Sequence, residues 1–197
     1  AFTPGWLENE SIWLHMEYKY LLELLKSGLY NDFYSEFKRI LIPFQKPQDY
    51  GRNILENSSF LVSSSFPDAR LHGNGFVARL SGSTAEFLEM WLLMSLGKSP
   101  FFLNAKNEVN LKFSPVLPGW LFDKHGIYSF NFLRDTRITY HNPKKKATFG
   151  KGKVNINRIV FKDKDDKAVE IKADIIPHPY AADLRSRLIR AIDIFMA

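Results

Sequence analysis

Residues Gly75 to Gly97, GFVARLSGSTAEFLEMWLLMSLG, join a short Gly/Ser turn to a segment that is apolar on nearly every side. Ser83, with Glu86 three positions later, forms a capping-box pattern, which predicts a helix that begins near Thr84. Gly97 supplies the C-terminal stop of this helix. Polar backbone and buried core therefore meet within a few residues, and the rest of the chain is organised around this junction.

The turn before the helix, Ser81-Gly82-Ser83, is a candidate anion site. A helix N-terminus presents free backbone N–H groups and the positive end of the helix dipole, which favour phosphate or carboxylate. The alternative is an ordinary helix start. On this stretch alone, the ordinary helix start is the commoner outcome.

The composition is that of a globular protein: 197 residues, of which 45% are hydrophobic and 15% aromatic, enough for one sizeable domain or two small ones. The absence of cysteine excludes disulfides and thiolate metal sites. No apolar run approaches the roughly 20 residues that span a bilayer, and no signal-peptide pattern opens the chain. We therefore expect a soluble protein with no membrane partner. The compartment that we expect is the bacterial cytoplasm, although the cysteine content does not distinguish it from secretion.

Charge is distributed unevenly along the chain. From Lys98 onward there are 19 Lys and Arg against 10 Asp and Glu, whereas the residues before it contain 8 against 11. A basic half can indicate nucleic-acid binding. The positive residues are scattered among alternating strands, however, apart from the run Lys144-Lys145-Lys146. We therefore expect no nucleic-acid partner.

Two helices are predicted before the central part of the chain, over residues 9–27 and 31–42. In the first, His15 shares a face with Tyr18 and Leu22 and should point inward. A core histidine satisfied by a neighbour and a ligand-binding histidine both fit this pattern, and the core histidine is the commoner of the two.

Residues 47–74 are too long and too polar for a plain connection, and loops of this length in compact domains are often functional. A solvated surface loop is the alternative. The polar and basic side chains of this segment that suit sugar hydroxyls or phosphate are Arg52, Arg70 and His72.

Beyond Pro100 the hydrophobic pattern changes to period two, which predicts strands in an antiparallel sheet or sandwich. The KDKDDK run, residues 162–167, is predicted to be a solvated hairpin loop. Residues 177–197 are predicted to form an amphipathic helix. The expected strands cover residues 109–113, 128–132, 137–140, 154–161 and 168–171.

Three segments together resemble the C-terminal part of glycoside hydrolase family 94, which includes cellobiose phosphorylase and the β-1,2-oligoglucan phosphorylases. They are ENESIWLHMEYKYLLELLKSGLY, then GFVARLSGSTAEFLEMW, then LPGWLFDKHGIYSFNFL with ITYHNP. The resemblance covers residues 5–143 and rests on the order in which the three segments occur. It implies a mixed α and β chain: the last helices and active-site loop of an (α/α)6 barrel (1–97), a jelly-roll-like antiparallel β-sandwich (98–176) and the terminal helix (177–197).

In that family, an aspartic acid protonates the glycosidic oxygen of a β-linked gluco-oligosaccharide. Inorganic phosphate, the co-substrate, attacks the anomeric carbon and releases glucose 1-phosphate with inversion; no cofactor takes part. A family histidine and a Thr-Gly pair bind the phosphate. The resemblance places His15 and the pair Ser81-Gly82 at those positions, with serine replacing threonine.

The resemblance also sets limits on the chain. The family's acid lies upstream of the ENxxIxxH-like helix, and only eight residues precede Asn9. We therefore expect no catalytic residue here. The chain would be a C-terminal fragment, inactive by itself, whose partners are the rest of the barrel and, if the parent enzyme is a dimer, a second copy. Glu86 and Phe87 replace an aromatic residue that often follows the Thr-Gly turn, which leaves the substrate open.

The long loop, with Glu56, Asn57, Arg70 and His72, would face the sugar subsites, although the resemblance gives these residues no defined role. A different class of function is a non-catalytic carbohydrate-binding or interaction module. In such a module, exposed aromatic side chains such as Trp6 or Trp120 would hold glycan.

Overall fold

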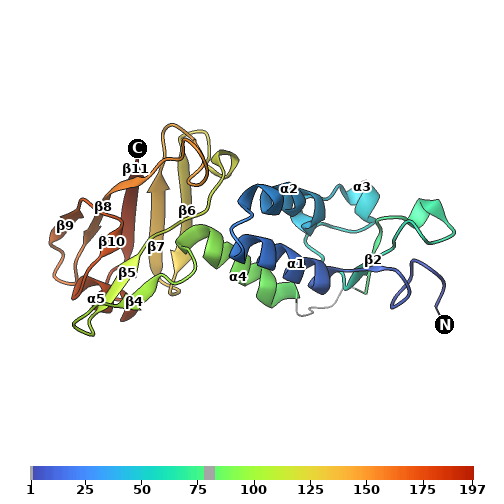
Figure 1. Ribbon diagram of the computed structural model, residues 1–197, viewed down its shortest axis with the longest axis horizontal. Coiled ribbons are helices and arrows are strands. Elements are labelled where there is room, and N and C mark those ends of the chain that lie inside the picture. Colours follow the sequence, from blue (N-terminus) through green and yellow to red (C-terminus); the bar gives the residue numbers. More distant parts are fainter. Residues whose placement is uncertain (1, 78–82) are drawn as a thin grey trace. The chain divides into compact units, whose positions relative to one another are not determined.

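The computed structural model describes residues 2–77 and 83–197. They form two compact units, Ala1–Trp91 and Leu92–Ala197. Helices gather in the first unit and strands in the second (Figure 1). The chain is thus of mixed α and β type, as the sequence predicts.

The first unit is built on three helices, α1 (Leu14–Lys26), α2 (Tyr30–Ile40) and the beginning of α4 (Ser83–Leu96), which continues into the second unit. The ammonium group of Lys26 on α1 lies 3.0 Å from the Glu89 carboxylate on α4. The described helices do not close a barrel by themselves. The core side chains of α1 are Leu14, Tyr18, Leu21, Leu22 and Leu25.

The segment predicted as one long loop contains regular structure. A turn of 3-10 helix, η1 (Ile42–Phe44), precedes the segment, and a short helix, α3 (Pro47–Tyr50), begins it. A second turn of 3-10 helix, η2 (Ala69–Leu71), lies near its end. Its middle supplies β2 (Phe60–Leu61), which pairs antiparallel with β1 (Ile12–Trp13) and β3 (Gly75–Phe76). The segment is therefore held by pairing with the strand that precedes α1 and with the strand that follows the segment itself.

Aromatic rings cover this small sheet. The Trp6 ring lies within 5.6 Å of three phenylalanine ring centroids, those of Phe60, Phe66 and Phe76. Trp13 adds a further contact with Phe60, at 5.6 Å between centroids. Trp6 is therefore half-buried and packed against the phenylalanine rings of this unit.

The second unit contains two sheets. A three-stranded antiparallel sheet has the order β10-β5-β4, and a five-stranded sheet has the order β6-β7-β11-β8-β9. Antiparallel pairing predominates, but β11 runs parallel to β7. The strands are β4 (Phe101–Leu103), β5 (Val109–Lys112), β6 (Ile127–Phe132), β7 (Thr136–His141), β8 (Ile156–Lys162), β9 (Ala168–Ile171), β10 (Ile175–Ile176) and β11 (Ala191–Met196).

The two sheets meet through a buried core. The Phe113 ring, just after β5, meets the Tyr140 ring of β7 edge to face at 6.3 Å, and both side chains are buried. The Tyr140 hydroxyl donates to the Ser95 carbonyl at 2.6 Å, which ties the last turn of α4 to the larger sheet. A short turn of 3-10 helix, η3 (Gly119–Leu121), precedes β6.

The predicted C-terminal helix is wrong for most of residues 177–197. Only α5 (Tyr180–Arg185) is helical, and it ends before Arg187, whose φ is +62°. The chain then forms β11, between β7 and β8. Ile192, Ile194 and Met196 are buried, and the intervening side chains are more exposed, which is the period of a strand.

The predicted strands are otherwise found within a few residues of their expected bounds, and 168–171 matches β9. The KDKDDK run joins β8 to β9, whose antiparallel register pairs Lys162 with Ala168. Across residues 2–77 and 83–197, no helix is both long and apolar enough to cross a membrane.

Candidate functional site

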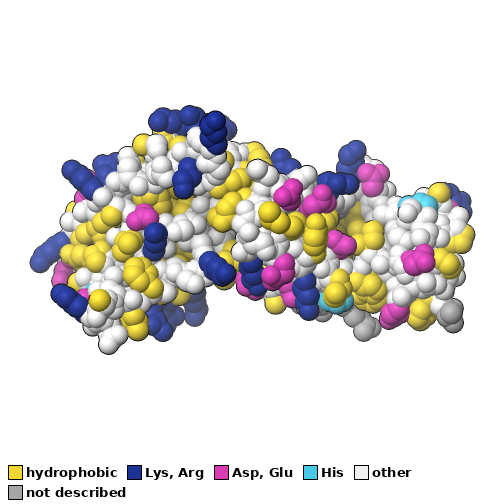
Figure 2. All heavy atoms as spheres, in the orientation of Figure 1, with side chains coloured by type: hydrophobic (Ala, Val, Ile, Leu, Met, Phe, Trp, Pro, Cys, Tyr) yellow, Lys and Arg dark blue, Asp and Glu magenta, His cyan; other side chains and the backbone are white. Residues whose placement is uncertain are grey.

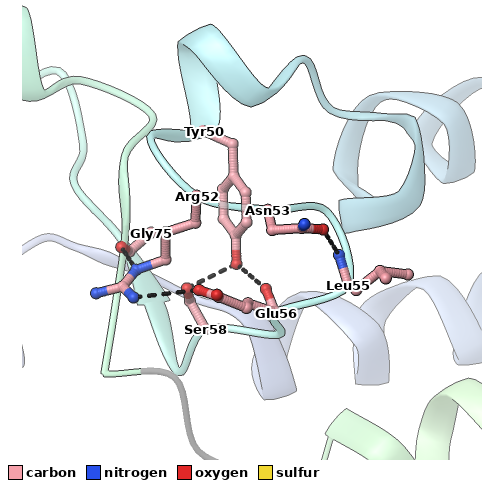
Figure 3. A network of polar contacts seen from close by, with 7 residues as sticks. All are labelled: Tyr50, Arg52, Asn53, Leu55, Glu56, Ser58 and Gly75. Carbon is pink, nitrogen blue, oxygen red and sulfur yellow. Dashed lines mark hydrogen bonds and ion pairs between the residues drawn. The ribbon is translucent and has the colours of Figure 1, made fainter.

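The loop of residues 51–57 forms one wall of the candidate site, and hydrogen bonds of Tyr50 hold it in place. Tyr50 is only 1% exposed, at the end of α3. Its hydroxyl donates to the Glu56 carbonyl at 2.6 Å and lies 2.6 Å from the Ser58 hydroxyl (Figure 3). Because two partners meet one buried hydroxyl, residues 51–57 are held as a closed loop.

Arg52 ties the same loop to strand β3. Its Nε donates to the Gly75 carbonyl at 2.5 Å, and its Nη1 lies 3.4 Å from a Glu56 carboxylate oxygen (Figure 3). A Cβ on Gly75 would overlap the Tyr50 ring and the Ser58 hydroxyl, so glycine is required at this close approach. Arg52 is therefore a structural anchor of the loop.

A pocket of about 260 Å³ lies against this loop. Its lining comes from four parts of the first unit: α1, η1, the loop and the first turn of α4. Asn57 and Thr84 contribute polar groups to a mostly apolar wall. The side chains that define it include Tyr18, Pro43, Ile54, Asn57, Thr84 and Phe87.

Two electrostatic features define this pocket. Burial raises the pKa of Tyr18 to about 12, against a weaker opposing effect of a hydrogen bond with the Ile42 backbone. The Tyr18 hydroxyl is therefore neutral at physiological pH. Thr84 lies in the first turn of α4, where unpaired N–H groups and the helix dipole give a positive potential.

Of the predicted phosphate-binding residues, His15 lies on α1, one turn before Tyr18. Although it lies three residues before Tyr18, His15 is not among the residues that line the pocket. It is half-buried, and the Trp13 ring meets it edge to face at 5.9 Å. The other two, Ser81 and Gly82, lie outside the described residues, immediately before α4.

The predicted sugar-facing residues separate into two groups. Asn57 lines the pocket, and the neighbouring Glu56 is exposed and paired with Arg52. Arg70 and His72 belong to the turn around η2 and are not among the residues that line the pocket.

That second group is held within its own turn. The Arg70 guanidinium lies 2.7 Å from the Asp68 carboxylate, and this bond holds the pKa of Asp68 at about 2. The His72 Nε2 lies 2.8 Å from the Phe66 carbonyl. The described contacts of Arg70 and His72 therefore support the fold of residues 66–72.

Sequence reasoning did not assign site roles to Tyr18, Tyr50 or Thr84. Tyr18 shows only a helical apolar spacing, which is common to core residues. Tyr50 gains its role from Ser58 and from the close approach of Gly75, and no local pattern signals such contacts. Thr84 was expected as the start of the helix, and that position is what brings it to the pocket.

Comparison with models of known protein families finds no match to this chain, and comparison with curated proteins finds none either. The site is therefore interpreted from its geometry together with the residues that carry the resemblance. Among the described residues, no group of three or more His, Asp and Glu side chains is placed to hold a metal ion.

Proposed function

We propose that this chain is the C-terminal part of an inverting β-glucoside phosphorylase of the family 94 type and contributes phosphate-binding residues to its active site. Phosphate attacks the anomeric carbon of a β-linked gluco-oligosaccharide, and glucose 1-phosphate leaves with inverted configuration. A general acid outside this sequence protonates the departing oxygen. The reaction belongs to cytoplasmic carbohydrate metabolism in bacteria.

The observation that carries this proposal is the pocket at the first turn of α4. In this proposal the backbone N–H groups of the Ser81-Gly82 pair, which immediately precedes α4 in the sequence, bind the phosphate. Asn57, from the loop that Tyr50 fastens, adds a side chain able to donate to a phosphate or a sugar hydroxyl. A fixed loop facing a helix N-terminus suits a reaction whose nucleophile is an anion.

His15 supplies the second phosphate contact in this proposal. Its helix also provides Tyr18 to the pocket wall. An imidazole N–H is a strong donor to a phosphate oxygen, and a protonated imidazole adds charge to that bond. Together His15 and the α4 turn would hold phosphate from two sides.

Exposed apolar side chains in the first unit support the presence of further helices in the parent enzyme. Met16 and Tyr20 on α1 are 57% and 52% exposed, and Leu88 on α4 is 59% exposed. Apolar faces of this kind usually mark an interface. We propose that they pack against the remaining helices of an (α/α)6 barrel, and that the second unit is its jelly-roll-like sandwich domain. A dimer of the parent enzyme is compatible with this assignment.

The test is phosphorolysis by the parent enzyme. With β-linked gluco-oligosaccharides and phosphate, the full-length protein should release the α anomer of glucose 1-phosphate, and this 197-residue chain alone should release none. Release of the β anomer by the full-length protein would contradict inversion. Turnover by the chain alone would contradict the assignment of the acid to another part of the protein.

One observation favours a second candidate, a non-catalytic carbohydrate-binding module. Trp120, in η3, is 40% exposed, and aromatic rings at a surface can stack on sugar rings. Calorimetry with oligosaccharides in the absence of phosphate distinguishes the two candidates. A module binds measurably and loses binding in Trp120→Ala, whereas the phosphorylase fragment binds sugar weakly and is indifferent to that substitution.

A further inference from the structure

A row of side chains crosses one face of the five-stranded sheet in the second unit. The register pairs His141 of β7 with Phe195 of β11, and Phe195 with Arg158 of β8. Directly paired residues lie on the same face of a sheet. Ile171, the last residue of β9, pairs antiparallel with Ile159. The next residue, Lys172, therefore lies opposite Arg158 and extends the same row.

Stacking fixes the middle of this row. The His141 and Phe195 rings are stacked, with centroids 4.5 Å apart and planes 11° apart. The Arg158 guanidinium carbon lies 4.1 Å from the centroid of the Phe195 ring, a cation–π distance. Phe195 is thus packed between an imidazole and a guanidinium, which limits the conformational freedom of both.

A β-bulge places a further polar group beside the row. Arg158 pairs with Phe195, but the next pair joins Ile156 to Met196, so Asn157 is an extra residue without a partner in the ladder. Bulges of this kind redirect side chains and are common beside binding sites. A pocket of about 410 Å³ lies at the bulge and is lined by His141, Asn157, Arg158 and Lys172, among others.

The pocket is lined by the positive side chains of Arg158 and Lys172. None of the described residues that line it is acidic. Asp193 accepts a hydrogen bond from His141 Nε2 at 2.7 Å, which leaves Nδ1 for another contact. Glu170 lies 3.9 Å from Arg158, at the limit of an ion pair. Within the described chain, the Lys172 side chain has no ion-pair or hydrogen-bond partner.

We infer that this pocket binds the phosphate group of a small anionic molecule. Arg158 offers a planar fork of donors and Lys172 a point charge, the two side chains that recognise phosphate most often. Asn157 adds a donor from another direction, and the protonated form of the His141 ring adds Nδ1–H, since its Nε2–H is donated to Asp193. The site lies wholly in the second unit and is independent of the phosphate site proposed for the first.

Proton NMR of the histidine ring Cε1–H signals provides a site-specific test. The chain has five histidines, so His141→Gln and His15→Gln assign the two signals of interest. Inorganic phosphate is titrated into the 197-residue chain at fixed pH, with sodium chloride holding the ionic strength constant. The His141 signal should shift and saturate, with a dissociation constant in roughly the millimolar range expected for a few charge-assisted hydrogen bonds.

Lys172→Gln and Arg158→Gln should each weaken this response roughly tenfold, the effect of losing one charged hydrogen bond. Lys106→Gln is the matched control, because it removes the same charge from an exposed turn between β4 and β5 and should leave the response unchanged. Unchanged far-ultraviolet circular dichroism in all three variants shows that the fold is kept.

A His141 signal that does not respond to phosphate, or that responds equally in Lys172→Gln and Lys106→Gln, overturns the inference. A stronger response to acetate than to phosphate overturns the assignment to a phosphate group. Because the His15 signal is followed in the same titration, failure at one site is distinguishable from failure at the other.

Discussion

At the scale of single residues, the Tyr50 hydroxyl is the main fastening of the candidate site. Tyr50→Phe should lower the free energy of unfolding by about 1–3 kcal/mol, because the buried Ser58 hydroxyl and the Glu56 carbonyl lose their partner. Chemical denaturation measures this loss. Tyr20→Phe is the control, since Tyr20 is 52% exposed and should change stability by less than about 0.5 kcal/mol. Equal effects of the two substitutions would contradict the role of Tyr50.

Buried tyrosines should make the protein sensitive to alkali. Burial raises the pKa of Tyr18 to about 12, and burial also raises the pKa values of Tyr128 and Tyr140. The unfolded chain releases these protons near the ordinary tyrosine value of 10.0, so the folded state binds more protons above that pH. The contribution of these tyrosines to the free energy of unfolding is therefore fully present below about pH 10 and is lost as the pH rises toward 12.

Urea unfolding at increasing pH, followed together with tyrosinate absorbance, measures this effect. Tyr18 alone should account for about 2 kcal/mol near its folded pKa, and Tyr18→Phe should remove that part of the pH dependence. Ionisation of all eight tyrosines before unfolding would contradict the burial of these hydroxyls.

Individual site residues were only partly predictable. Asn57 was expected in the site because polar loops of this length in compact domains are often functional, and it lines the pocket. Arg70 and His72 had the same kind of signal, but the Asp68 carboxylate and the Phe66 carbonyl engage them locally. A sequence pattern shows which groups are polar, and it does not show whether a near neighbour will satisfy them.

At the scale of elements, β11 holds the second unit together because it pairs with both β7 and β8. Ile194 in β11 is fully buried, and Ile194→Ala should cost about 2–5 kcal/mol through lost burial and the cavity left behind. Val169→Ala is the control, because Val169 is half-buried on the edge strand β9 and should lose about 1 kcal/mol or less. Thermal unfolding compares the two, and a larger loss from Val169→Ala would contradict the central position of β11.

The last element also shows where helical periodicity misleads. Leu184, Leu188, Ile192 and Phe195 recur at spacings of three and four, which predicts a helix. In the structure Leu188 is 49% exposed, and the buried positions after it alternate as in a strand. Both periods are present in the sequence. The strand is formed because β7 and β8 offer backbone partners on both sides, and only the tertiary structure contains that information.

The helices α1, α2 and α4 were predictable because their apolar spacing or capping residues are local. The first helix was nevertheless expected from residue 9, whereas α1 begins at Leu14 and Ile12–Trp13 form β1. The Gly97 stop has a φ of +95°, the conformation in which helices commonly end at glycine. By contrast, β1, β2 and β3 are only two residues long each, too short to show a period, and were missed. The aromatic rings around them explain why they are stable despite their length.

At the scale of the whole molecule, charge separates the two units as the sequence indicates. On the face seen in Figure 2, Lys and Arg side chains stand out around the unit with the sheets, and Asp and Glu are frequent over the helices. The pockets show a similar division. The pocket at the start of α4 is mostly apolar, whereas the pocket at the β8–β11 bulge of the second unit lies at a row of basic side chains. Neither pocket was predictable, because each joins residues far apart in the chain.

In the proposed phosphorylase, His15 binds the phosphate that attacks the sugar. In the full-length enzyme, His15→Gln should raise the KM for phosphate roughly tenfold, the effect of one lost charge-assisted hydrogen bond, and leave the KM for oligosaccharide nearly unchanged. His125→Gln, an exposed histidine of the second unit, is the control and should change neither. An unchanged KM for phosphate in His15→Gln, or an equal rise in both KM values, would contradict the claim.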